Sequence, residues 1–131
     1  MIGAPLQTRR RKKTGAARIF AAAGYSLAGF RRLMQEPAFR QELVVGVIVL
    51  IGLALIQAPA HHILGATLLL LALLATEALN TAIEYVVDHL SPEISDFARH
   101  AKDIGSFAVF CMLCANALFI GYILIQAVIY S

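Results

Sequence analysis

LVVGVIVLIGLALIQAPAHHILGATLLLLALLAT, residues 43–76, contains no charged side chain and decides the fold. Its 34 residues are too many for one membrane span, which needs about 20 residues to cross about 30 Å of hydrocarbon. The segment QAPAHH at residues 57–62 contains a proline and divides the stretch into two apolar arms of 14 residues each. Each arm is too short to span alone, so each helix has to continue past its charged end. The stretch therefore predicts a hairpin of two membrane helices.

A third uncharged stretch, the 27 residues 104–130, is long enough to span by itself. Of the 131 residues, 60% are hydrophobic and 15% are charged, whereas soluble domains have about 45–50% apolar and about 25% charged residues. The composition also excludes intrinsic disorder, because too much apolar surface would face water. We therefore predict an all-α integral membrane protein, a bundle with three transmembrane helices.

The distribution of lysine and arginine predicts the orientation. Nine of the eleven precede residue 43, while the 57–62 turn and the C-terminus hold none. The positive-inside rule then predicts a cytoplasmic N-terminus and a C-terminus on the far side. We expect the basic run at residues 9–13 to touch anionic headgroups. Nucleic-acid binding is not expected, because nothing aromatic or groove-reading accompanies this run.

An amphipathic helix lying in the membrane interface is predicted before the first span. Its apolar side chains fall on one helical stripe while Arg18, Arg31 and Arg32 fall elsewhere. The chain is thus expected to form one membrane domain over residues 1–131. Its predicted parts are a basic cytoplasmic tail at 1–13, the surface helix at 14–35, spans at 37–57, 63–90 and 100–130, and a cytoplasmic loop at 91–99.

Acidic side chains in or beside the spans call for an explanation, because a carboxylate at mid-bilayer is costly. Counting about 1.5 Å per residue from the 57–62 turn puts Glu36 and Glu84 at one level, near the headgroups. The same count puts Glu42 and Glu77 at a common, deeper level. Five polar residues share one face of the second span at helical spacing: Glu77, Asn80, Thr81, Glu84 and Asp88. A polar seam between helices is one interpretation, but the carboxylates would repel each other unless cations or protons intervened.

A divalent cation between Glu36 and Glu84 would offset that repulsion, since Mg²⁺ is typically held by one or two carboxylates together with substrate phosphates. Lys102 would supply a phosphate contact, and Glu77 could accept a proton from a substrate hydroxyl. The pattern indicates phosphoryl transfer at the membrane surface, although no P-loop or protein-kinase motif is present. A proton-coupled transporter or ion conduit fits the residues almost as well, and a purely structural polar seam is a third possibility.

The sequence around these residues closely resembles the prokaryotic membrane-integrated diacylglycerol kinase family. The resemblance rests on EALNTAIEYVVD at 77–88 and AKD at 101–103, with support from AAGYS at 22–26 and AFRQE at 38–42. It extends over about residues 18–109. Two departures lie in the loop before the third span, where His100 and Ser95 stand at positions at which relatives carry Arg and His, respectively. Thr81 replaces the commoner Ser and keeps the hydroxyl.

The resemblance implies a homotrimeric kinase of the bacterial cytoplasmic (inner) membrane, with active sites on the cytoplasmic side between neighbouring subunits. It implies transfer of the γ-phosphoryl of MgATP to diacylglycerol, giving phosphatidic acid. A sister branch phosphorylates undecaprenol instead. Glu77 corresponds to the general base, with Asn80 and Lys102 also in catalytic positions, and Glu36 and Glu84 correspond to the Mg²⁺ ligands. The nucleotide- and substrate-binding positions are Arg18, Tyr25, Ser26, Glu36, Glu84, Asp88, Glu93, Lys102 and Asp103.

Overall fold

The computed structural model describes residues 14–131, and the basic run at residues 9–13 lies outside this range. The described chain contains four helices, α1 (Ala16–Leu33), α2 (Pro37–Leu55), α3 (Ala60–Leu90) and α4 (Asp96–Ile129). Three of them, α2, α3 and α4, are long and apolar enough to cross a membrane. The predicted all-helical fold with three potential spans is confirmed.

The chain divides into two compact units, one ending at Arg32 and the other starting at Leu33. Helix α1 lies almost entirely in the first unit, and it follows Gly15, whose φ of 64° is in the left-handed region that favours glycine. Arg31 and Arg32 stand in its last turn, where positive charge complements the helix dipole.

Helices α2 and α3 form the predicted hairpin. Pro37 is the first residue of α2, a position where its missing N–H leaves no hydrogen bond unmade. At the other end of α2, the Gln57 N–H donates to the Ala54 carbonyl and the Ala58 N–H donates to the Leu53 carbonyl. This is a Schellman motif, and its left-handed position is occupied by Gln57 with φ 55°. Helix α3 then begins at Ala60 rather than residue 63, because the Pro59 carbonyl already accepts helical bonds from residues 62 and 63.

The connection between α3 and α4 is shorter than the predicted loop at 91–99. Helix α4 begins at Asp96 rather than at residue 100. The cause is Ser95, whose Oγ accepts a hydrogen bond from the Ala98 N–H at 3.1 Å and so caps the helix. Ser91, at the end of α3, lies with its Oγ 3.0 Å from the Ser95 Oγ. The two serines thereby join the end of α3 to the start of α4.

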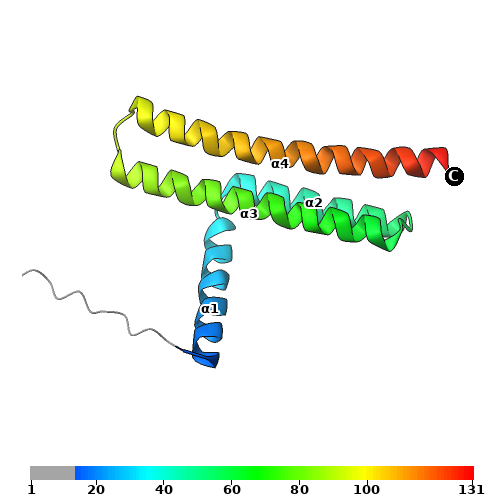
Figure 1. Ribbon diagram of the computed structural model, residues 1–131, viewed down its shortest axis with the longest axis horizontal. Coiled ribbons are helices and arrows are strands. Elements are labelled where there is room, and N and C mark those ends of the chain that lie inside the picture. The colour runs from blue at the N-terminus through cyan, green and yellow to red at the C-terminus, as the bar shows by residue number, and fades with distance from the viewer. Residues whose placement is uncertain (1–13) are drawn as a thin grey trace, which may run out of the picture. The chain divides into compact units, whose positions relative to one another are not determined.

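Within the second unit, α2 and α4 pack chiefly on α3, and neighbouring helices along the chain run in opposite directions (Figure 1). We call the end that holds residues 56–59 the turn end and the end that holds residues 91–95 the loop end. Buried apolar residues occur along all three helices, and one contiguous cluster of them, Leu53, Ala66 and Ile123, lies toward the turn end. Nearer mid-bundle, the Asn116 Nδ2 of α4 donates to the Leu69 carbonyl of α3 at 3.1 Å. This bond satisfies a polar side chain between two apolar helices.

Candidate functional site

The first three residues of the polar face of α3 point into the bundle and are buried there. Glu77, Asn80 and Thr81 are the buried polar or charged residues of the described chain, and each exposes less than a tenth of its surface. Burial of a carboxylate and an amide is costly unless each has partners. Because apolar residues would pack here at lower cost, we infer that these polar side chains serve binding or catalysis and not packing alone.

Asn80 binds the next carboxylate along the same face. Its Nδ2 donates to Glu84 Oε1 at 3.3 Å, across one helical turn. The Asn80 Oδ1 is buried and has no hydrogen-bond partner among the described residues. Asn80 thus orients Glu84 through one end of its amide while the other end rests against the packed helix interface.

Glu36, just before α2, reaches the same level of the bundle as Glu84. Its Oε1 accepts a hydrogen bond of 2.5 Å from the hydroxyl of Tyr85, the residue that follows Glu84. The Tyr85 bond places Glu36 beside the segment of α3 that carries Glu84, in line with the common level that the helical rise predicted for the two carboxylates.

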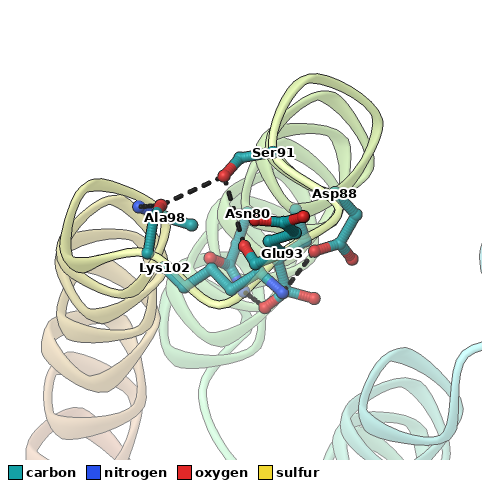
Figure 2. Close-up of polar contacts among 8 residues, drawn as sticks. Asn80, Asp88, Ser91, Glu93, Ala98 and Lys102 are labelled. Atoms are coloured by element: carbon teal, nitrogen blue, oxygen red, sulfur yellow. Dashed lines mark hydrogen bonds and ion pairs between the residues drawn. The ribbon is translucent and has the colours of Figure 1, made fainter.

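Lys102 reaches this polar face from α4. Figure 2 shows its side chain extending from α4 toward α3, where its Nζ forms an ion pair of 2.5 Å with Asp88 Oδ1. Both side chains remain partly exposed, so the pair is accessible from the loop end. Ser91 lies near it in the same view, and its contact with Ser95 joins the two ends of the short connection from which α4 starts. The Lys102 ammonium group is therefore held next to the carboxylates and remains accessible to solvent.

A cavity of about 630 Å³ lies between α2, α3 and α4 and includes Glu77 in its wall. Glu42 lines it from α2, and its Oε2 is buried without a hydrogen-bond partner among the described residues. Glu42 and Glu77 therefore line the same cavity from two neighbouring helices. The remaining lining is largely aliphatic, including Val49, Leu70 and Ile120. An apolar pocket with a few convergent polar groups at one end has the general form of a ligand site.

Glu36 and Glu84 have the chemistry of ligands for a hard divalent cation. Both are carboxylates at one level, and both are oriented by hydrogen bonds, from Tyr85 and Asn80 respectively. No group of three or more His, Cys, Asp or Glu side chains suited to a metal occurs within residues 14–131. Two carboxylates nevertheless fit Mg²⁺, which commonly retains waters and binds substrate phosphates at its remaining positions.

The other predicted site residues lie in two places. Asp103 is an exposed residue of α4, and Glu93 lies in the α3–α4 connection, where its carbonyl accepts a bond from the Ser91 hydroxyl. Arg18, Tyr25 and Ser26 are exposed residues of α1, in the first unit. The structure thus brings together the carboxylates, Asn80 and Lys102, all from the second unit.

Sequence reasoning missed several residues that organise this group: Tyr85, Ser91 and the capping role of Ser95. Tyr85 is part of the quoted motif, but the helical face that carries Glu77 and Glu84 gave no reason to single it out. Ser95 followed by Asp96 is a helix-start signal that could have located the beginning of α4.

The fold and the site define a helical membrane protein with a buried carboxylate face beside an apolar cavity. Residues 24–125 match the family model of prokaryotic diacylglycerol kinase. The chain is 44% identical to the diacylglycerol kinase of Sinorhizobium sp over 114 residues, which cover 87% of this chain and 83% of the relative. The corresponding protein of Escherichia coli K12 is 40% identical over 102 residues, 73% of this chain and 80% of the relative. The chain therefore belongs to the prokaryotic diacylglycerol kinase family, and it is a kinase.

Proposed function

We propose that this protein transfers the γ-phosphoryl group of MgATP to the hydroxyl of diacylglycerol, giving phosphatidic acid. The observation that carries the proposal is the cavity, which joins an aliphatic interior to Glu77. Diacylglycerol has long apolar chains and one hydroxyl at its polar end. Its chains would fit the aliphatic part of the cavity, and its hydroxyl would lie near Glu77. Family membership supports the same substrate, since the relatives from Sinorhizobium and Escherichia coli are named diacylglycerol kinases.

In the proposed reaction, the acceptor hydroxyl oxygen bonds to the γ-phosphorus, and the bond from that phosphorus to the β–γ bridging oxygen breaks, releasing ADP. The hydroxyl proton passes to Glu77, whose carboxylate lines the cavity. Little covalent chemistry is asked of the protein in such a transfer, so positioning and charge dominate. This agrees with a site made of carboxylates, one amide and one lysine.

Glu36 and Glu84 would hold Mg²⁺, which would neutralise charge on the phosphate oxygens. Asn80 orients Glu84 for this task. Lys102 would bind a phosphate oxygen, exchanging its ion pair with Asp88 for a contact to the nucleotide. Glu93 and Asp103, near the loop end, would complete the nucleotide contacts.

The finer architecture belongs to the same proposal. The loop end faces the cytoplasm of a bacterial inner membrane, as the nine N-terminal basic residues favour. Helix α1 lies in the interface and supplies Arg18, Tyr25 and Ser26 to the nucleotide or lipid. Three copies of the chain assemble into a homotrimer with sites between neighbouring subunits.

The direct test is phosphorylation of lipids in detergent micelles by the purified protein, with γ-labelled ATP and Mg²⁺. Diacylglycerol and undecaprenol are assayed side by side, and we expect faster labelling of diacylglycerol. Faster labelling of undecaprenol would transfer the proposal to the other lipid. Labelling of neither lipid, combined with ATP-independent ion flux in proteoliposomes, would replace the kinase with a conduit.

A further inference from the structure

Gly105 marks an unusually close approach of α4 to α3. It is buried, and a Cβ added to it would collide with the Oδ1 of Asn80 and lie 3.3 Å from the Asn80 Cγ. Glycine is the residue that allows such an approach of one backbone to another group. At this level of the bundle, the packing of the two helices therefore depends on the absence of a side chain at residue 105.

The atom that would be displaced belongs to a side chain with little freedom to move. Asn80 is 8% exposed, and its Nδ2 is bonded to Glu84 Oε1. Because the oxygen and nitrogen are fixed to one planar amide, turning Oδ1 away from residue 105 also turns Nδ2 away from Glu84. A methyl group on α4 would thus alter the orientation of a carboxylate with which it makes no contact of its own.

We propose that Gly105 is a positioning residue for the Glu84 carboxylate, acting through the Asn80 amide. The glycine lets α4 hold the amide in the one orientation that donates to Glu84 Oε1, leaving Glu84 Oε2 to face a divalent cation. The inference rests on the proposed role of Glu84 as a Mg²⁺ ligand. It assigns a function in metal binding to a residue that has no ligand atom.

Two other glycines provide matched controls. A Cβ on Gly65 of α3 would lie 2.7 Å from the ring of Phe119 on α4, so it tests a tight α3–α4 approach in an apolar region. A Cβ on Gly121 of α4 would meet nothing within 4 Å. Gly65→Ala measures the effect of a steric clash between α3 and α4 that does not involve the Asn80 amide. Gly121→Ala measures the effect of replacing a glycine by alanine without any clash.

The experiment measures binding of Mn²⁺, a paramagnetic substitute for Mg²⁺, to the full chain in micelles without ATP or lipid. We expect Gly105→Ala to weaken Mn²⁺ binding about tenfold or more. Gly65→Ala should lower the unfolding temperature by a similar amount as Gly105→Ala yet leave Mn²⁺ affinity unchanged, and Gly121→Ala should change neither. Equal Mn²⁺ affinity in Gly105→Ala and Gly65→Ala would overturn the proposal and leave Gly105 a packing residue.

A double-mutant cycle tests whether the effect passes through Asn80. In Asn80→Ala the clashing oxygen is gone, and an added Cβ at residue 105 would stand 4.0 Å from the Cβ of residue 80, an ordinary contact. We therefore expect Gly105→Ala to cause no further loss of Mn²⁺ affinity in the Asn80→Ala background. Multiplicative losses would mean that Gly105 acts by another route, and the proposal would be wrong.

The outcomes also separate this inference from the proposed function. If the parent chain binds Mn²⁺ and Gly105→Ala selectively loses it, the inference stands even if no lipid is phosphorylated. If lipid is phosphorylated but the parent chain binds no Mn²⁺ on its own, both the metal role of Glu84 in the free protein and the positioning role of Gly105 are wrong.

Discussion

The turn end of the bundle is closed by apolar side chains and by main-chain hydrogen bonds. Its core of Leu53, Ala66 and Ile123 contains no polar group, and the Schellman motif satisfies the last carbonyls of α2. The loop end has polar side-chain contacts between elements, such as Tyr85 to Glu36 and Lys102 to Asp88, in addition to buried apolar residues such as Val87. The turn end therefore lacks the charged contacts that the candidate site at the loop end requires. Substitutions at the two ends should consequently affect different measurements.

The largest expected effect is at Glu77, in the buried face that leads to the loop end. Removal of a general base typically costs 10²–10⁴-fold in rate, so we expect Glu77→Gln to reduce kcat for lipid phosphorylation about 100-fold, or about 2.7 kcal/mol. Thr76→Val is the neighbouring control, because the Thr76 hydroxyl is bonded to the Ala72 carbonyl of its own helix. Full turnover in Glu77→Gln would refute the base assignment, and a loss of only about tenfold would make the base a minor contributor.

Substitution of Ile123 should have the opposite effect, lowering the free energy of unfolding while changing kcat little. It exposes 2% of its surface in the core at the turn end. Truncation of such a side chain leaves a cavity, and we expect Ile123→Ala to lower the free energy of unfolding by about 2 kcal/mol. Unfolding in mixed micelles measures this, with the exposed Ile125→Ala as the control. A fall in kcat per folded molecule would contradict the separation of the two ends.

Ser95 lies between these extremes, because it is a structural residue at the loop end. Loss of a helix N-cap costs about 1 kcal/mol, so Ser95→Ala should reduce stability by that amount and raise the KM for ATP more than it lowers kcat. Ser95→Asp should restore stability, since aspartate is an equally good cap. If Ser95→Ala were as stable as the parent chain, the Ala98–Ser95 hydrogen bond would not be what starts α4.

The smallest expected effect is a gain in stability at Gln57. This residue has φ 55°, which costs a side-chain-bearing residue about 1 kcal/mol compared with glycine. Gln57→Gly should therefore raise the free energy of unfolding by about 0.5 kcal/mol, after the larger chain entropy of glycine is counted. Gln57→Ala retains the Cβ and should bring no gain. An equal gain from alanine would show that the glutamine side chain, and not its backbone, is unfavourable.

The sequence was sufficient for the three spans, because a stretch without charges has few alternatives to a membrane helix. It also sufficed to place Glu36 near Glu84 along the bundle, since the helical rise converts residue number into distance along a helix. It failed at the first turn of α4, where the Ser95 cap outweighs the polar character of residues 96–100. It could not reveal the bond between Glu36 and Tyr85, nor the fit of Gly105 against Asn80, because these depend on the rotation of each helix about its axis.

The cavity that contains Glu77 is bounded by α2 and α4, which pack on α3 far more than on each other. Its lining residues all belong to three helices that are apolar enough to cross a membrane. Under the proposed function, its lipid substrate would therefore arrive by diffusion within the bilayer and not through water. The concentration that governs its occupancy is a mole fraction within the bilayer. Dilution of a micelle or vesicle with inert lipid at constant total volume should therefore slow turnover, whereas dilution with buffer at a constant concentration of MgATP should not.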